Sequence, residues 1–158
     1  MGETVQIAEY FYVQVPDKAG EGARLLAQLK EAGVNLLAFS GFPQGRKAQI
    51  DFVPEDPRAF KAAARKAKWQ ISASKKVFLI QGEDRVGVGA ELMGKLAEAK
   101  INVIASQAIT AGGGRFGMIL WVAPADVRKA AKALGAATAP PKAEAAEAAP
   151  PANEAPSI

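Results

Sequence analysis

Hydrophobic and polar positions in the first 74 residues alternate between strand-like and helix-like patterns. Aromatic and β-branched residues fill 9–15, whereas apolar residues after Gly20 recur at helical spacing as far as Glu31. Gly33 follows at the position where a glycine commonly ends a helix. The pattern predicts strands at 9–15, 34–42, 47–53 and 69–74, with helices at 21–31 and 58–67. The predicted order is therefore β-α-β-β-α-β.

The same pattern occurs a second time. Residues 79–106 repeat residues 12–39 without a gap, and the turn Asp-x-x-Gly-x-Gly-Ala occurs in both copies, as does a lone asparagine, Asn35 or Asn102. Amphipathic patterning alone does not produce such matches. A repeat of this kind indicates two small modules built to one plan.

The second module is predicted to begin with a strand at 76–82. The elements that follow are a helix at 89–100, strands at 101–109 and 114–123, and a helix at 126–134. No strand pattern follows Leu134, so the last strand of the plan is missing or is formed by residues from elsewhere.

These patterns predict an α+β fold of two ferredoxin-like βαββαβ modules, each an antiparallel sheet with both helices on one face. The predicted domains are residues 1–74 and 75–135, joined only by Lys75-Lys76. Two such sheets can lie edge to edge and cover each other's unpaired strands. Residues 136–158 contain ten alanines and five prolines. We expect them to form a flexible tail that is dispensable for folding.

Composition narrows the function classes. The 158 residues include no cysteine and no histidine, which removes the commonest metal ligand and general base. No nucleophile–base pair, dinucleotide-binding motif or P-loop is present. We therefore predict a protein that is not an enzyme and that has no cofactor and no metal site. The chain lacks an apolar run of about 20 residues and a secretory signal pattern, so we expect a cytoplasmic location without membrane contact.

The repeated motifs resemble those of tandem ACT-domain proteins. The resemblance covers residues 9 to about 134 and rests on two turns, Asp17-Lys18-Ala19-Gly20 and Asp84-Arg85-Val86-Gly87. It also rests on the helix-to-strand junctions at 32–36 and 99–103. It implies a regulatory module that binds small ligands, often amino acids, at interfaces between ACT domains. Because no catalytic domain accompanies the two modules, we expect regulation to act on a separate enzyme, or the chain to serve as a ligand sensor or carrier.

Both copies depart from the family pattern in the same way. Ala19 and Val86 stand where the family usually has proline, and Gly22 and Gly89 stand where it usually has leucine. A missing side chain at a helix N-terminus lets another molecule approach the backbone closely. It equally allows a different entry angle of the helix.

The turns have a chemistry that suits an amino acid. Unpaired amides in the first helical turn attract a carboxylate, and an asparagine oxygen can accept from an ammonium group. The predicted ligand-binding residues are Asp17, Lys18, Ala19, Gly20, Gly22, Asn35, Asp84, Arg85, Val86, Gly87, Gly89 and Asn102. Val88 in place of Glu21 makes the second turn less acidic and favours it for an anion. Alternatively, the aspartates cap the helices and the asparagines stabilise turns.

Two expectations concern larger partners. Uncovered edges predict a homodimer, with Phe39, Phe42 and Trp121 as candidate contacts. The alternative function is RNA binding, because the same fold plan underlies RNA-recognition motifs and Arg115-Phe116 lie on the third strand of module two. The sequence pI of about 9.4 is compatible with nucleic acid but does not require it.

Overall fold

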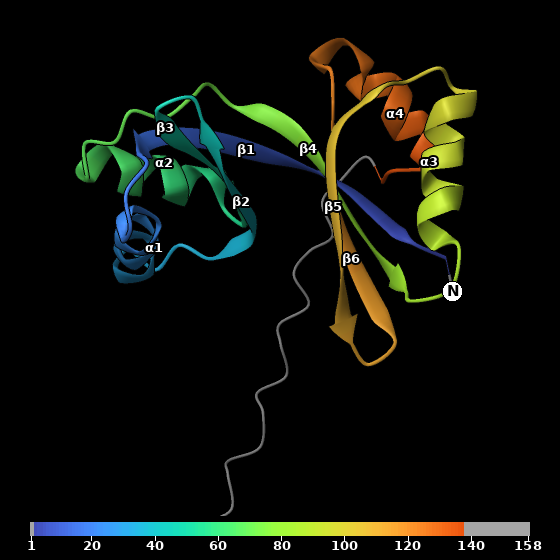
Figure 1. Cartoon of the computed structure of the whole chain (residues 1–158), viewed down its shortest axis with the longest axis horizontal. Coiled ribbons are helices and arrows are strands. Elements are labelled where there is room, and N and C mark those ends of the chain that lie inside the picture. The colour runs from blue at the N-terminus through green and yellow to red at the C-terminus, as the bar shows by residue number, and fades with distance from the viewer. Residues whose placement is uncertain (1, 138–158) are drawn as a thin grey trace, which may run out of the picture.

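The computed structural model describes residues 2–137, and its framework is one antiparallel sheet in the order β2-β3-β1-β4-β6-β5 (Figure 1). The strands are β1 (Thr4–Pro16), β2 (Leu36–Gln44), β3 (Lys47–Pro54), β4 (Lys75–Glu83), β5 (Val103–Gly112) and β6 (Arg115–Val122). The helices are α1 (Glu21–Glu31), α2 (Pro57–Lys66), α3 (Val88–Glu98) and α4 (Val127–Leu134), with a short 3₁₀ turn at Pro124–Asp126. Two ferredoxin-like units, as predicted, make up this α+β fold.

Strand β1 belongs to both units. Residues Thr4–Tyr10 pair with β4, whereas Phe11–Pro16 pair with β3. The first half of β1 is therefore the strand that the second unit lacks after α4. A continuous period-two pattern makes this possible, because Val5 and Val13 are buried on the same side of β1, each under its own pair of helices.

The end of the first unit differs from the sequence prediction. Residues 69–74 do not form a strand, because only Ile71 pairs with β1, through an isolated bridge to Val13. Lys75 and Lys76, predicted as a linker, already lie in β4 and pair with β1. Strand β4 pairs with the first half of β1. Residues 69–74 therefore make only a single bridge to the second half of β1 before the chain continues into β4.

The helices cover one face of each half of the sheet (Figure 1). Under α1 and α2, Phe11 stacks on Phe60 with ring centroids 5.1 Å apart, beside the buried Phe52. Under α3 and α4, the core contains Phe78 and Leu120 among its buried residues. These apolar clusters account for the helical and alternating patterns of the sequence.

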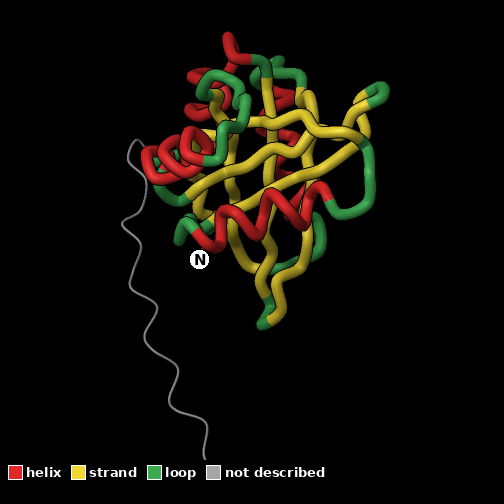
Figure 2. Tube along the Cα trace, turned by 90° about the vertical axis from the view of Figure 1, so that its left-hand side faces the viewer, coloured by secondary structure: helices red, strands yellow, loops and turns green. Residues whose placement is uncertain are grey.

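A third cluster lies on the helix-free side of the sheet. Ala8, Tyr10, Val53, Val77 and Trp121 are buried there, where the two halves meet. Figure 2 shows the strands of the halves crossing one another rather than continuing in one flat layer. The twist therefore turns the helix-free faces of the two halves toward each other.

The last described residues of the chain lie beside its first strand, β1. Gly135 ends α4 in a left-handed conformation, and the amide of Ala137 donates to the carbonyl of Val5 at 3.2 Å. Ala136 packs against the core of the second unit. These two residues, predicted as the start of the tail, thus contact the folded unit, and the rest of the predicted tail lies outside the described residues. Within residues 2–137, no helix is long and apolar enough to cross a membrane.

Candidate functional site

Both predicted turns have the same backbone geometry. Gly20 and Gly87 precede α1 and α3 with φ values of 91° and 90°, a left-handed conformation that glycine adopts readily. Neither helix has a side-chain hydrogen bond at its N-cap, so Asp17 and Asp84 do not cap them. Helix α2, in contrast, is capped by Asp56, which accepts from the amides of Arg58 and Ala59. The first turns of α1 and α3 therefore keep amides available for an anion.

Space is open over both first turns. A Cβ atom added to Gly89 would have no neighbour within 4 Å. One added to Gly22 would meet only Ile50 Cδ1, at the ordinary contact distance of 3.7 Å. Gly22 and Gly89 thus leave the helix N-termini accessible. Val86 is fully exposed, and Asp17, Lys18, Ala19 and Asp84 are also exposed.

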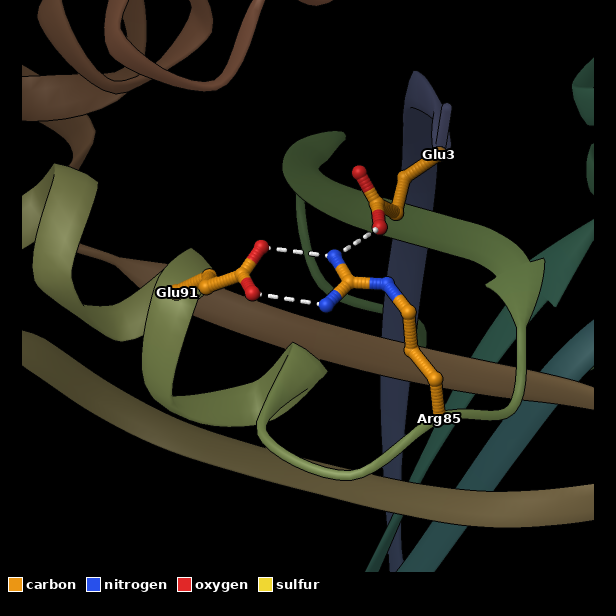
Figure 3. A network of polar contacts seen from close by, with 3 residues as sticks. All are labelled: Glu3, Arg85 and Glu91. Atoms are coloured by element: carbon orange, nitrogen blue, oxygen red, sulfur yellow. Dashed lines mark hydrogen bonds and ion pairs between the residues drawn. The ribbon is translucent and has the colours of Figure 1, made fainter. Parts of the chain in front are cut away.

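Arg85 in the second turn is held by two carboxylates (Figure 3). Its Nη1 and Nη2 atoms each donate to Glu91 at 2.6 Å, and Nη2 also donates to Glu3 at 3.1 Å. The hydrogen bond from Arg85 lowers the pKa of Glu91. The pKa of Glu3 is lowered first by a backbone hydrogen bond and then by Arg85. A ligand carboxylate that used Arg85 would have to compete with both groups.

The second turn is consequently more acidic than Val88 alone suggests. Glu3 reaches the second turn from the N-terminal end of β1. The sequence pattern alone does not place this end of β1 beside α3. The charges are arranged differently in the first repeat. There Glu21 forms an ion pair with Arg24 at 2.6 Å, and Lys18 is not part of that pair. The two turns share their backbone geometry but differ in their electrostatics.

The two asparagines lie away from the turns of their own repeats. Helix α1 has 11 residues, which corresponds to roughly 16 Å at 1.5 Å per residue, and it separates Gly20 from Asn35. The same holds for Gly87 and Asn102 across the 11 residues of α3. A single repeat therefore does not bring its turn and its asparagine together.

Asn35 already has a partner. Its Nδ2 donates to Glu55 Oε2 at 3.0 Å, and the amide of Glu55 donates to the Asn35 carbonyl at the same distance. Asn35 thus holds the loop after β3 through a residue 20 positions away, and not its own turn through local backbone bonds. Asn102 is exposed, and its side chain has no hydrogen bond within residues 2–137. In the second repeat, Ala123 stands where Glu55 stands in the first, so the acceptor is missing.

The basis for the RNA-binding alternative is not present. Phe116 is 5% exposed and packs in the core beneath α3 and α4, together with Met118 and Leu120. RNA-recognition motifs stack bases on aromatic residues of the open sheet face. Arg115 is exposed, but the aromatic residue beside it cannot contact a base.

The fold is shared with solved structures of other proteins. A protein from Bacteroides thetaiotaomicron superposes with a TM-score of 0.70 at 17% identity, over 83% of this chain and 88% of that one. The ligand-free regulatory subunit of aspartate kinase from Thermus thermophilus gives 0.58 at 16%, over 85% and 95%. The aspartate kinase of Clostridium acetobutylicum gives 0.53 at 14%, over 84% of this chain and 33% of the enzyme. No protein-family model and no curated sequence matches the chain.

Proposed function

We propose that this protein is a regulatory amino-acid sensor that holds the carboxylate of its ligand at the N-termini of α1 and α3. The observation that carries the proposal is the pair of left-handed glycines, Gly20 and Gly87, each followed by a helix without a side-chain cap. Amides in such a turn point at an approaching anion and are favoured by the helix dipole. Because this turn geometry occurs in both repeats, we infer that the two turns have the same function.

The ammonium group of the ligand would be bound by an asparagine of a second copy. Within one chain, each turn is separated from its asparagine by a whole helix, so a complete site needs Asn35 or Asn102 from elsewhere. The edge strands β2 and β5 expose Phe39 (55%) and Ile109 (74%), which a second copy would cover. We therefore propose a homodimer. Trp121, one of the predicted contacts, is 8% exposed in the single chain and contributes little to such an interface.

Regulation would act in trans on a separate enzyme. The structural neighbour from Thermus thermophilus is described as a regulatory subunit, and this chain spans 95% of it. Ligand binding to such a module would be transmitted to the enzyme through a surface that the two proteins share. Differential binding of amino acid to the free and enzyme-bound forms would shift the equilibrium between them.

Calorimetry with the twenty common amino acids tests the proposal. Wild-type protein should bind at least one of them, and Gly22→Leu or Gly89→Leu should weaken that binding at least 10-fold by filling the space over the amides. Gly94→Leu is the matched control, because it adds the same side chain later in α3, where no atom lies within 4 Å of its Cβ. The assignment of the turns would be contradicted if no amino acid lost affinity in the double variant Gly22→Leu/Gly89→Leu. The dimer is tested separately by sedimentation.

A further inference from the structure

A groove of about 920 Å³ lies between the helix-free faces of the two halves. Its lining includes Tyr10, Phe42, Asp51, Lys75, Ile104 and Trp121. This volume is typical of small-molecule sites. None of the predicted turn or asparagine residues lines it, so it is separate from the sites at the helix N-termini.

Asp51 places a carboxylate in this groove. The residue is only 5% exposed, on the helix-free side of β3, between the buried Ile50 and Phe52 of the opposite face. Gln49 Nε2 donates to one of its oxygens at 2.9 Å, and no cation lies within 4.0 Å of it in residues 2–137. Burial raises its pKa. A buried carboxylate without a paired cation is costly, and a strand-interior position gives it no capping or turn role.

Trp121 adds an unsatisfied donor on the facing half. Its side chain is 8% exposed, and its Nε1 atom is buried without an acceptor among the described residues. The indole stands edge-on to Tyr10, with ring centroids 6.3 Å apart and an interplanar angle of 86°. Buried indole N–H groups usually find a partner. Trp121 therefore contributes its ring to the groove lining, and Asp51 is the acceptor there that no cation of the described residues satisfies.

The lining also contains basic residues and exposed apolar residues. Lys75, Lys76 and Arg128 carry positive charge, and Lys76 is partly compensated by Glu9 at 3.8 Å. Phe42 and Ile104 are 40% and 62% exposed, so a ligand in the groove would gain apolar contact with them. One carboxylate, several cations and an apolar wall together select a molecule that carries both charges and an apolar part.

We propose that this groove binds an α-amino acid with an apolar side chain. Its ammonium group pairs with Asp51, its carboxylate takes Lys75 as a donor, and its side chain packs on Phe42 and Ile104. A simple amine would leave the cations unmatched, whereas a simple carboxylate would be repelled by Asp51. Unlike the sites at the turns, this one is complete within a single chain and does not depend on them.

Calorimetry with three related probes tests the assignment. L-leucine should bind at least 10-fold more tightly than 4-methylpentanoate, which lacks the ammonium group, and than 3-methylbutylamine, which lacks the carboxylate. Asp51→Asn should weaken leucine binding at least 10-fold, and Lys75→Gln should weaken it several-fold. Glu31→Gln, which neutralises an exposed acid on α1, is the matched control and should bind like the wild type. Equal binding of leucine by wild type and Asp51→Asn would overturn the proposal.

Fluorescence separates the groove from the turns. The chain has two tryptophans, so in a Trp69→Phe background Trp121 is the single emitter and reports on the groove. Leucine should change its emission, and Gly89→Leu should leave that change intact. If leucine binds but Gly89→Leu abolishes the heat and Trp121 emission never changes, the groove is refuted and the turn sites stand. An emission change that follows protein concentration instead of leucine would show a second copy in the groove and also overturn the proposal. The Asp51→Asn calorimetry needs no Trp69 substitution and remains decisive if that background folds poorly.

Discussion

Ser40 Oγ donates a hydrogen bond to Gln107 Oε1 at 3.0 Å, and these residues are 67 positions apart, the same offset that relates the two repeats. Equivalent positions of the two modules therefore touch each other. Glu9 and Lys76, also 67 apart (76 − 9), face each other in the β1–β4 ladder. An approximate two-fold axis thus passes through the centre of the sheet and through the contact between its two edge strands, β2 and β5. Ser40 and Gln107 also line the groove between the two halves.

The Ser40–Gln107 bond should stabilise the closed arrangement of the halves. Because Ser40 is only 8% exposed, Ser40→Ala should lower the free energy of unfolding by about 0.5–1.5 kcal/mol in urea denaturation. Ser106→Ala, at an exposed neighbouring position, should have little effect. In a double-mutant cycle with Gln107→Ala, strictly additive effects would show that the bond does not contribute.

The first half of β1 should be essential to the second unit. Val5 is 4% exposed and packs in the core under α3 and α4, so Val5→Ala should cost about 1–3 kcal/mol of unfolding free energy. Thr4→Ala, next to it but exposed, is the control. Equal stabilities of the two variants would mean that residues 4–10 are not integrated into the second unit.

Asp51 should make the protein less stable at neutral pH than at mildly acidic pH. Burial raises its folded pKa, while Gln49 and Lys75 act in the opposite direction, and Tyr10 lies nearby. The folded state therefore binds the proton more tightly, and this residue's contribution is lost as the pH rises through the folded pKa. Asp51→Asn should raise the Tm at pH 7 and lose this advantage below the ordinary pKa of an aspartate. A lower Tm of the variant at pH 7 would contradict the assignment.

Arg85 should keep the pKa of the Glu91 carboxyl group below its ordinary value. Without the guanidinium, the Glu91 pKa should rise toward its ordinary value, which an NMR titration of Arg85→Gln can measure. The stabilisation that depends on this lowered pKa is present at neutral pH and disappears as the pH falls through the folded pKa. Arg24→Gln, which breaks the Glu21 pair in the first repeat, should leave the Glu91 titration unchanged.

Residues Ala136 and Ala137 should mark the end of the cooperative fold. A chain that ends after Gly135 loses the hydrogen bond from Ala137 to Val5 and the packing of Ala136. It should be about 1 kcal/mol less stable than a chain that ends after Ala137. Indistinguishable denaturation curves would show that this contact with β1 adds nothing.

The sequence alone determined the features that depend on neighbouring residues. The repeat predicted two units of one plan, the periodicities predicted all four helices and most strands, and the glycines at 20 and 87 marked the turns where φ is positive. Such features follow from local backbone preference and from which face of an element is apolar. The division of the chain at residue 74 and the binding role of the turn residues remain predictions.

The tertiary structure decided which distant segments meet. A period-two pattern tells which side of β1 is buried, but it does not say that one strand serves two units. Asp51 and Trp121 face one groove because the sheet twists until the halves oppose each other. These relations depend on strand pairing and twist accumulated over the whole sheet, which no short stretch of sequence encodes.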